Sequence, residues 1–173
     1  MPSLLRGYQH LSIQKRVVTF SLLLILIAFD QITKWWVLEI LMPGPRAIEV
    51  TDFFNLVLVM NPGVSFGIFS DGDWWVRWVL VFFACILSGV LFIWMVRTQD
   101  VFTAVGLALI VSGAVGNLID RLRFGAVVDF LDLHYMTWHW PAFNVADSSI
   151  TVGVGLLILD SFKTKAEIPE DKR

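Results

Sequence analysis

The chain has 173 residues, of which 57% are hydrophobic and 16% charged, and its mean hydropathy is +0.72. Soluble proteins average about 45–50% apolar and about 25% charged residues, so this composition excludes an ordinary soluble domain and indicates an integral membrane protein. The formal net charge of −2 at pH 7 gives no indication of a nucleic-acid partner. The single cysteine, Cys85, cannot form a disulfide within the chain, and its place inside an apolar run predicts a buried side chain.

The first membrane-spanning helix is predicted over about residues 17–37. Its start is similar to a signal peptide, but no small-residue cleavage site follows it and three more apolar segments come later. Asp30 and Lys34 lie near its far end with i,i+4 spacing, which puts both side chains on one helix face and permits an ion pair. Two interpretations of these residues are equally open: they form an ion pair at the membrane interface, or they have a direct role in the function.

The segment 38–73 is predicted to lie outside the membrane. The runs 47–51 and 53–60 are strand-length and rich in Val, Phe and Leu, so we expect a small sheet at the membrane surface. A loop follows at Asn61-Pro62-Gly63, because a residue before proline is biased to an extended conformation and glycine permits unusual backbone angles. This loop either presents Asn61 to a functional site or is an ordinary connection.

The second and third spans are predicted over about 74–95 and 101–119. The third ends in small residues, including Gly116, that allow close helix contact. Packing does not account for the polar residues that follow at Asn117, Asp120 and Arg121. Their spacings of three and four residues place them on one helix face, and interfacial charge is the alternative interpretation for the last two.

The segment 120–142 is predicted to lie outside the membrane again. Its apolar part, 127–133, is predicted to be a strand or a short interfacial helix and contains Asp129. Trp138 and Trp140 are suited to the level of the lipid headgroups.

The fourth span is predicted over about 143–159, with Asn144 and Asp147 at its start. Helix starts favour such residues because their side chains accept hydrogen bonds from free backbone N–H groups. Capping explains one of these two residues, but it does not explain the whole set of polar residues. The polar tail, 163–173, is predicted to be disordered.

The distribution of basic residues predicts the orientation. With four spans, both termini and the connection between spans two and three share one side, which carries Arg6, Lys15, Arg16, Arg97, Lys163, Lys165, Lys172 and Arg173. The other side and the helix ends near it carry Lys34, Arg46, Arg77, Arg121 and Arg123. Because basic residues are enriched on the cytoplasmic side, both termini are predicted to be cytoplasmic. Asn61, Asp129 and Asp147 therefore share the outer face.

Asp129 and Asp147 are the candidate catalytic pair. A carboxylate within the membrane costs about 2.5–3.5 kcal/mol on insertion scales, so two aspartates in apolar segments indicate a function. Two carboxylates held close together do not both ionise readily, and one keeps its proton while the other is an anion. The anion activates a water molecule and the neutral acid polarises a peptide carbonyl, as in aspartic peptidases. Other polar residues are candidates to hold the substrate or the aspartates: Asn61, Asn117, Arg121 and Asn144.

Other chemistry fits the sequence less well. His10, His134 and His139 show no spacing with Cys or Glu that is typical of a zinc site, and the roles of the latter two histidines stay open. No serine lies on a recognisable nucleophile elbow. A small transporter or channel that uses the same two aspartates for cations or protons is the alternative function. A non-enzymatic scaffold whose polar residues pack helices is a second alternative.

Taken together, these motifs resemble those of the lipoprotein signal peptidase family, signal peptidase II, whose members are bacterial membrane aspartic peptidases. The motifs follow the family's order over nearly the whole chain from Asp30 to Ser148, in stretches 30–34 (DQITK), 61–66 (NPGVSF), 116–121 (GNLIDR), 127–130 (VVDF) and 143–148 (FNVADS). Pro62 stands where a small polar residue is more usual, which puts the shape of that loop in doubt but not the chemistry.

This resemblance implies that Asp129 and Asp147 form a catalytic dyad within a single all-α membrane domain of four helices with a small extracytoplasmic sheet. It implies cleavage of bacterial prolipoproteins before their diacylglyceryl-cysteine, at the outer face of the inner membrane. The expected partners are these substrates and membrane lipid; we expect a monomer without cofactor or metal, and the inhibitor globomycin is expected in the same cleft. The residues implied to line or support the site are Asp30, Lys34, Asn61, Gly63, Asn117, Asp120, Arg121 and Asn144.

Overall fold

The computed structural model describes residues 13–44, 47–63 and 74–166. Within them, four helices are long and apolar enough to cross a membrane: α1 (Ile13–Leu41), α2 (Trp74–Arg97), α3 (Val101–Phe124) and α4 (Val145–Ala166). Four strands complete the described structure: β1 (Ala47–Thr51), β2 (Phe54–Asn61), β3 (Val127–Tyr135) and β4 (Trp138–His139). The predicted fold class, a four-helix membrane protein with a small sheet, is confirmed.

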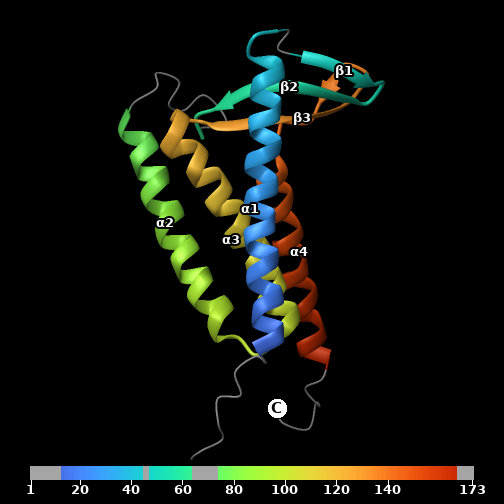
Figure 1. The fold of residues 1–173 in the computed structure, drawn as a ribbon. Coiled ribbons are helices and arrows are strands. Elements are labelled where there is room, and N and C mark those ends of the chain that lie inside the picture. Colours follow the sequence, from blue (N-terminus) through green and yellow to red (C-terminus); the bar gives the residue numbers. More distant parts are fainter. Residues whose placement is uncertain (1–12, 45–46, 64–73, 167–173) are drawn as a thin grey trace, which may run out of the picture.

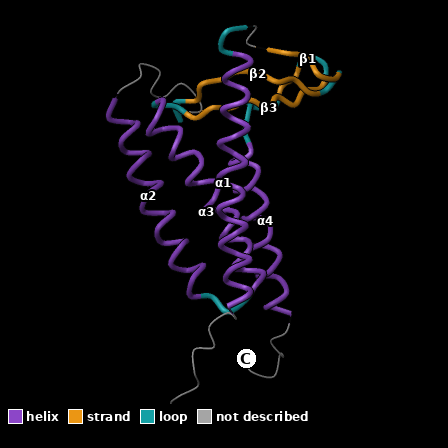
Figure 2. Tube along the Cα trace, in the orientation of Figure 1, coloured by secondary structure: helices purple, strands orange, loops and turns teal. Residues whose placement is uncertain are grey.

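All the strands gather at one end of the helices (Figure 2). The first turn of α1 and the last turn of α4 lie together at the opposite end (Figure 1). Helix α4 continues to Ala166, so residues 163–166 of the predicted disordered tail are helical. Lysine and alanine are good helix formers, which favours this extension. The remainder of the tail and the loop beyond Gly63 lie outside the described residues.

Helix α3 is the centre of the bundle, since it contacts each of the other three helices. It begins where the Asp100 side chain accepts a hydrogen bond of 2.6 Å from the backbone N–H of Thr103. It ends at Gly125, whose φ of 79° is the left-handed conformation that glycine adopts readily. The end of α3 is therefore set locally, and the chain turns directly into β3.

Glycines allow α3 and α4 to approach closely. A Cβ built on Gly153 of α4 would lie 2.6 Å from the carbonyl oxygen of Gly106 in α3, which is closer than real side chains come. Small residues at helix contacts are the usual means of tight packing in membranes, where lipid is as apolar as the helix surface. Gly113 of α3 lies equally close to the backbone of Ala146 in α4. This second contact brings the last turns of α3 beside the first turn of α4.

The sheet is antiparallel in the order β1-β2-β3-β4. The segment 127–133, which the sequence left between strand and interfacial helix, is therefore a strand. Val59 of β2 pairs with Asp129 of β3, and Asn61 pairs with Val127. A buried cluster of Val37, Leu41 and Phe130 joins the sheet to α1.

Large apolar side chains cover the outside of the bundle. Helix α2 alone exposes Phe82, Phe83 and Ile86, each at least half exposed. Such a surface suits contact with lipid rather than water. Cys85 is also exposed, so the prediction that it is buried is wrong. A span that packs against one neighbour leaves most of its apolar surface facing lipid, and its composition does not distinguish the two faces.

Candidate active site

Five elements bring polar side chains together at the junction between the sheet and the helices. Strand β2 contributes Asn61, and β3 contributes Asp129. The end of α3 contributes Asn117, Asp120 and Arg121; the start of α4 contributes Asp147, preceded by Asn144; and α1 contributes Asp30 and Lys34. The structure thus places every residue that the sequence singled out in one connected region.

Asp129 is only 2% exposed and is held at both carboxylate oxygens. Its Oδ2 accepts a hydrogen bond of 2.8 Å from Nδ2 of Asn61, and its Oδ1 accepts one of 2.7 Å from Nδ2 of Asn144. The first contact follows from the pairing of β2 with β3, which sets Asn61 two positions along from the residue opposite Asp129. Both donors are neutral amides, so they fix the carboxyl group without neutralising its charge.

Asp147 is held by α3 and by the helix start on which it lies. Its Oδ1 accepts a hydrogen bond of 2.8 Å from Nδ2 of Asn117. Its Oδ2 accepts the backbone N–H of Asn144 at 3.2 Å, while its own N–H donates to Oδ1 of Asn144 at 2.9 Å. This reciprocal pair is a helix-capping arrangement, as the sequence allowed.

Asn144 connects the two aspartates, since its side chain binds Asp129 and its backbone binds Asp147. It is completely buried. Capping alone would use only its backbone and its side-chain oxygen, so the contact between its Nδ2 and Asp129 is an additional role. The two carboxylates are therefore bridged by one asparagine, although they lie 18 positions apart in the chain.

Burial raises the pKa of Asp129 to about 6. The hydrogen bond from Asn61 acts in the opposite direction, and the charge of Asp147 raises the pKa further. Asp147 therefore lies near enough for the two carboxyl groups to influence each other's ionisation. A carboxyl group whose pKa is raised toward neutral pH can act as a general acid.

Arg121 and Gly63 complete the rim of the site. Arg121 carries its charge toward Asp147, Asp129 and Asp120, and its Nη1 donates to the carbonyl oxygen of Asn117 at 3.4 Å. Its Nε is buried and has no partner among the described residues. Gly63 has a φ of 93°, and its N–H donates to Oδ1 of Asn61 at 2.8 Å. This bond orients the Asn61 amide so that its nitrogen faces Asp129.

A buried group of charges joins α1 to α3 next to these residues. Lys34 of α1 forms ion pairs of 2.9 Å with Asp30 and 2.7 Å with Asp120 of α3. Gln31 was missed by the sequence analysis, although it follows Asp30 directly. Its Nε2 lies 3.2 Å from Asp30 Oδ2 and 3.0 Å from Asp120 Oδ1. The sequence did contain a signal for it, because a polar glutamine next to Asp30 is unusual within an apolar helix.

A groove of about 450 Å³ opens beside Asp147. Its lining is mainly apolar and comes from β3, the segment after β4, and α4: Leu133, Trp140, Phe143, Asp147, Ser148, Thr151 and Val152. The sequence analysis placed Trp140 at headgroup level but did not assign this groove. Apolar residues are so common in a membrane chain that no pattern sets these apart.

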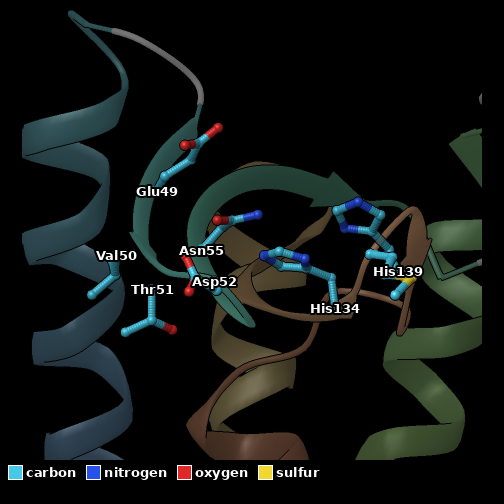
Figure 3. A pocket seen from close by; sticks show the side chains of 8 residues that line it. Glu49, Val50, Thr51, Asp52, Asn55, His134 and His139 are labelled. Atoms are coloured by element: carbon cyan, nitrogen blue, oxygen red, sulfur yellow. The ribbon is translucent and has the colours of Figure 1, made fainter.

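A second cavity, of about 610 Å³, lies at the far end of the sheet and is polar. Figure 3 shows Glu49, Asn55, His134 and His139 around it. The His134 and His139 rings stack with centroids 5.0 Å apart, and Nδ1 of His139 lies 2.9 Å from both oxygens of Asp132. Across residues 13–44, 47–63 and 74–166, no three His, Cys, Asp or Glu side chains are grouped so that they could hold a metal ion.

Comparison with known proteins identifies one family, because the matching family model and the similar proteins carry the same name. Residues 22–163 match the family model for signal peptidase (SPase) II. The lipoprotein signal peptidase of Pseudoalteromonas atlantica is 44% identical over 151 residues, which cover 86% of this chain and 92% of that protein. The lipoprotein signal peptidase of Paraburkholderia phytofirmans is 48% identical over 142 residues, 81% of each chain.

Solved structures are similar in fold as well. A bacterial membrane enzyme determined by the in meso method at 2.3 Å resolution superposes with a TM-score of 0.78 at 28% identity, covering 95% of this chain and 98% of the other. A second bacterial membrane enzyme, determined by the same method at 1.9 Å resolution, gives a TM-score of 0.75 at 29% identity, covering 91% of this chain and 99% of the other.

Proposed function

The chain belongs to the signal peptidase II family, and from this premise we propose that it removes signal peptides from lipid-modified bacterial prolipoproteins by aspartic catalysis at Asp129 and Asp147. The observation that carries the proposal is the bridge through Asn144, which holds a buried carboxyl group with a pKa of about 6 beside a second carboxylate. Such pairs of unequal carboxyl groups divide the acid and base roles between them.

In the proposed mechanism, Asp129 carries the proton and Asp147 is the anion. Asp147 takes a proton from a water molecule, whose oxygen attacks the scissile carbonyl while Asp129 donates to the carbonyl oxygen. As the tetrahedral intermediate collapses, Asp147 gives the proton it took from water to the leaving amide nitrogen of the lipid-modified cysteine, and Asp129 takes back a proton from a hydroxyl group of the intermediate. The C–N bond breaks, and both carboxyl groups return to their starting protonation states. General acid and general base terms of this kind contribute roughly 100- to 10,000-fold each. No covalent enzyme intermediate and no cofactor are needed.

The groove beside Asp147 is the proposed site for the apolar part of the substrate. Its apolar lining from Leu133, Trp140 and Phe143 suits an acyl chain or a signal-peptide side chain. A diacylglyceryl group stays in lipid with about 0.8 kcal/mol per buried CH2, so it holds the scissile bond at the membrane interface. The dyad lies at the sheet end of the helices, where such an interface is expected.

The remaining site residues are proposed to hold the substrate or the dyad. Arg121 has an unpartnered buried Nε and faces both aspartates, so its guanidinium is suited to bind a substrate carbonyl. Asn61 and Gly63 hold Asp129 from the loop after β2, and Asn117 holds Asp147. Lys34 supports these residues by joining α1 to α3, through its ion pairs with Asp30 and Asp120.

The proposed location is the bacterial inner membrane, with both termini in the cytoplasm and the sheet at the outer face. The excess of Lys and Arg at the end that carries the termini supports this orientation. The active site then lies at the outer face, the same side as the lipid-modified cysteine at which the proposed cleavage takes place. The protein is proposed to work as a monomer in a single membrane domain, since all of the proposed catalytic groups come from one chain.

The test is cleavage of a diacylglyceryl-modified precursor by the purified protein in detergent, followed as a mass shift. Asp129→Asn and Asp147→Asn should each remain folded and lose at least about 100-fold in kcat. Asp132→Asn is the matched control on the same strand, because Asp132 binds Asn55 and His139 rather than the dyad. Undiminished turnover in either dyad variant would refute the proposal. Proton or cation flux that depends on the same aspartates, without cleavage, would favour a transporter instead.

A further inference from the structure

The hairpin formed by β3 and β4 separates the groove beside Asp147 from the polar cavity. The backbone N–H of Trp140, directly after β4, donates to the carbonyl oxygen of Leu133 at 2.8 Å, and His134 pairs with His139. Successive side chains of a strand point to opposite faces of a sheet. Accordingly, Leu133 and Trp140 line the groove, whereas His134 and His139 line the cavity (Figure 3). A contact on the cavity face of this hairpin therefore also fixes a wall of the groove.

The backbone alone holds this hairpin weakly. Strand β4 has only two residues and lies at the edge of the sheet, where it pairs with β3. In the turn before it, Met136 has a φ of 53°, in the left-handed region that is uncommon for residues other than glycine. Short two-stranded pairings are marginally stable by themselves. The position of Trp140, which follows β4 directly, therefore depends on side-chain contacts that hold β4 in place.

Asp132 of β3 supplies such a contact on the cavity face. Nδ1 of His139 lies 2.9 Å from each oxygen of the Asp132 carboxylate, and Nδ2 of Asn55 in β2 donates to its Oδ2 at 2.9 Å. Burial would raise the pKa of Asp132, but the hydrogen bonds from His139 and Asn55 outweigh burial and keep this pKa below its usual value. Because an ionised carboxylate only accepts, Nδ1 of His139 carries a hydrogen. One carboxylate thus joins β2, β3 and β4.

The contact with Asp132 becomes stronger when the His139 ring gains a proton, because a charge-assisted hydrogen bond exceeds a neutral one. Histidine changes its charge between about pH 5 and pH 8. The rings of His134 and His139 stack with centroids 5.0 Å apart, so charges on both rings would repel. One positive charge is accommodated here, on the ring that binds the carboxylate. Glu49 of β1 and Asp52 of the β1–β2 turn line the same cavity and favour this charge, and no Lys or Arg within the described ranges lines it.

We propose that His139 is a positioning residue for the substrate groove: through Asp132 it holds Trp140 in the groove wall, and it does so more firmly when its ring is charged. The inference rests on the proposed function, in which this groove takes the apolar part of the substrate, and it gives His139 no contact with that substrate. The precursor accordingly binds more tightly as the pH falls. The dyad keeps its own contacts, so His139 acts on KM and leaves kcat unchanged.

The experiment measures kcat and KM for a diacylglyceryl-modified precursor peptide at about pH 5.5 and about pH 7.5. His139→Asn keeps a neutral donor near the position of Nδ1 but does not titrate. His134→Asn is the matched control, because both ring nitrogens of His134 have no partner among the described residues. Asp129 titrates in every protein compared, so each KM is divided by the wild-type KM at the same pH. Because the side chain of His139 is half exposed, this ratio for His139→Asn should rise only about threefold from the higher to the lower pH. The ratio for His134→Asn should not change.

Two further variants test the path from His139 to the groove. Asp132→Asn removes the charge that the ring binds, so its KM ratio should show the same pH dependence, with wild-type kcat. In Trp140→Ala the groove wall is absent, so adding His139→Asn should raise KM no further at the lower pH. KM ratios that do not vary with pH, additive effects in the double variant, or a loss of kcat would each overturn the inference. Failure of the proposed function looks different, because Asp129→Asn would then cleave as well as wild type.

Discussion

The side chain of Asn144 donates to Oδ1 of Asp129 at 2.7 Å, across the junction between α4 and β3. The same residue accepts and donates hydrogen bonds with Asp147 at the start of α4. A single buried asparagine therefore makes both catalytic candidates part of one hydrogen-bonded unit.

Asn144→Ala should lower kcat by roughly 100-fold, because it removes the hydrogen bond to the Asp129 carboxyl group and the side-chain acceptor of the Asp147 N–H, and a misplacement of about 1 Å at a catalytic site costs about 100-fold in rate. The cleavage assay with lipid-modified precursor measures it. Asn55→Ala is the matched control, since Asn55 also donates to a buried aspartate, Asp132, but away from the dyad. Equal activity of the two variants would show that the bridge is dispensable.

The pH profile of kcat/KM should have an alkaline limb near pH 6. Asp129, with a pKa of about 6, is ionised above this pH, and a doubly ionised dyad has no acid to donate to the carbonyl. Activity in the free enzyme should therefore decline as the pH rises through this value. A profile that is flat from pH 5 to pH 8 would contradict the assignment of the proton to Asp129.

The same pKa predicts a stability effect of definite sign. The folded protein binds the Asp129 proton more tightly than the unfolded chain, whose pKa is 3.8, so this contribution to stability is complete below about pH 3.8 and is lost as the pH rises through about 6. Its size is on the order of 3 kcal/mol. The difference in thermal midpoint between Asp129→Asn and wild type should therefore grow in favour of the variant from pH 4 to pH 6. A difference that does not vary with pH would mean that Asp129 ionises alike in both states.

Gly63→Ala should reduce activity roughly tenfold and lower the thermal midpoint. An alanine at a φ of 93° is strained by about 1–2 kcal/mol, and its Cβ would lie 2.5 Å from Cδ1 of Leu80. Relief of the strain moves the N–H that orients Asn61. Gly89→Ala in α2 is the control, because a Cβ there meets nothing within 4 Å and alanine favours a helix. The control should retain full activity and at least the wild-type midpoint.

Trp140→Ala should raise KM for the lipid-modified precursor roughly tenfold, because it removes a large apolar side chain from the groove beside Asp147. The dyad keeps its contacts, so kcat should not change. Trp138→Ala is the control, since Trp138 packs edge-on against Trp140 but does not line the groove. An increase in KM for the control alone would place substrate binding on the opposite side of this tryptophan pair.

Much of the fold could be predicted from the sequence because its signals are local. Apolar length predicted the four spans, and short runs rich in Val, Phe and Leu predicted the first two strands, whereas residues 127–133 were left between a strand and an interfacial helix. The aspartates stand out at Asp129 and Asp147 because a charge in an apolar segment is energetically unfavourable. The order of the short motifs was sufficient to predict the family.

Which atoms meet was decided only by the tertiary structure. Gly113 of α3 lies against Ala146 at the start of α4, which lets the two helices approach until Asn117 reaches Asp147. Lys34 reaches Asp120 from another helix. The exposure of Cys85 and the lining of the groove likewise depend on which helix face packs inward. In a membrane the core and the lipid are equally apolar, so composition does not distinguish a packed face from a lipid-facing one. Close contact between helices, rather than residue pattern, determined how the dyad is held.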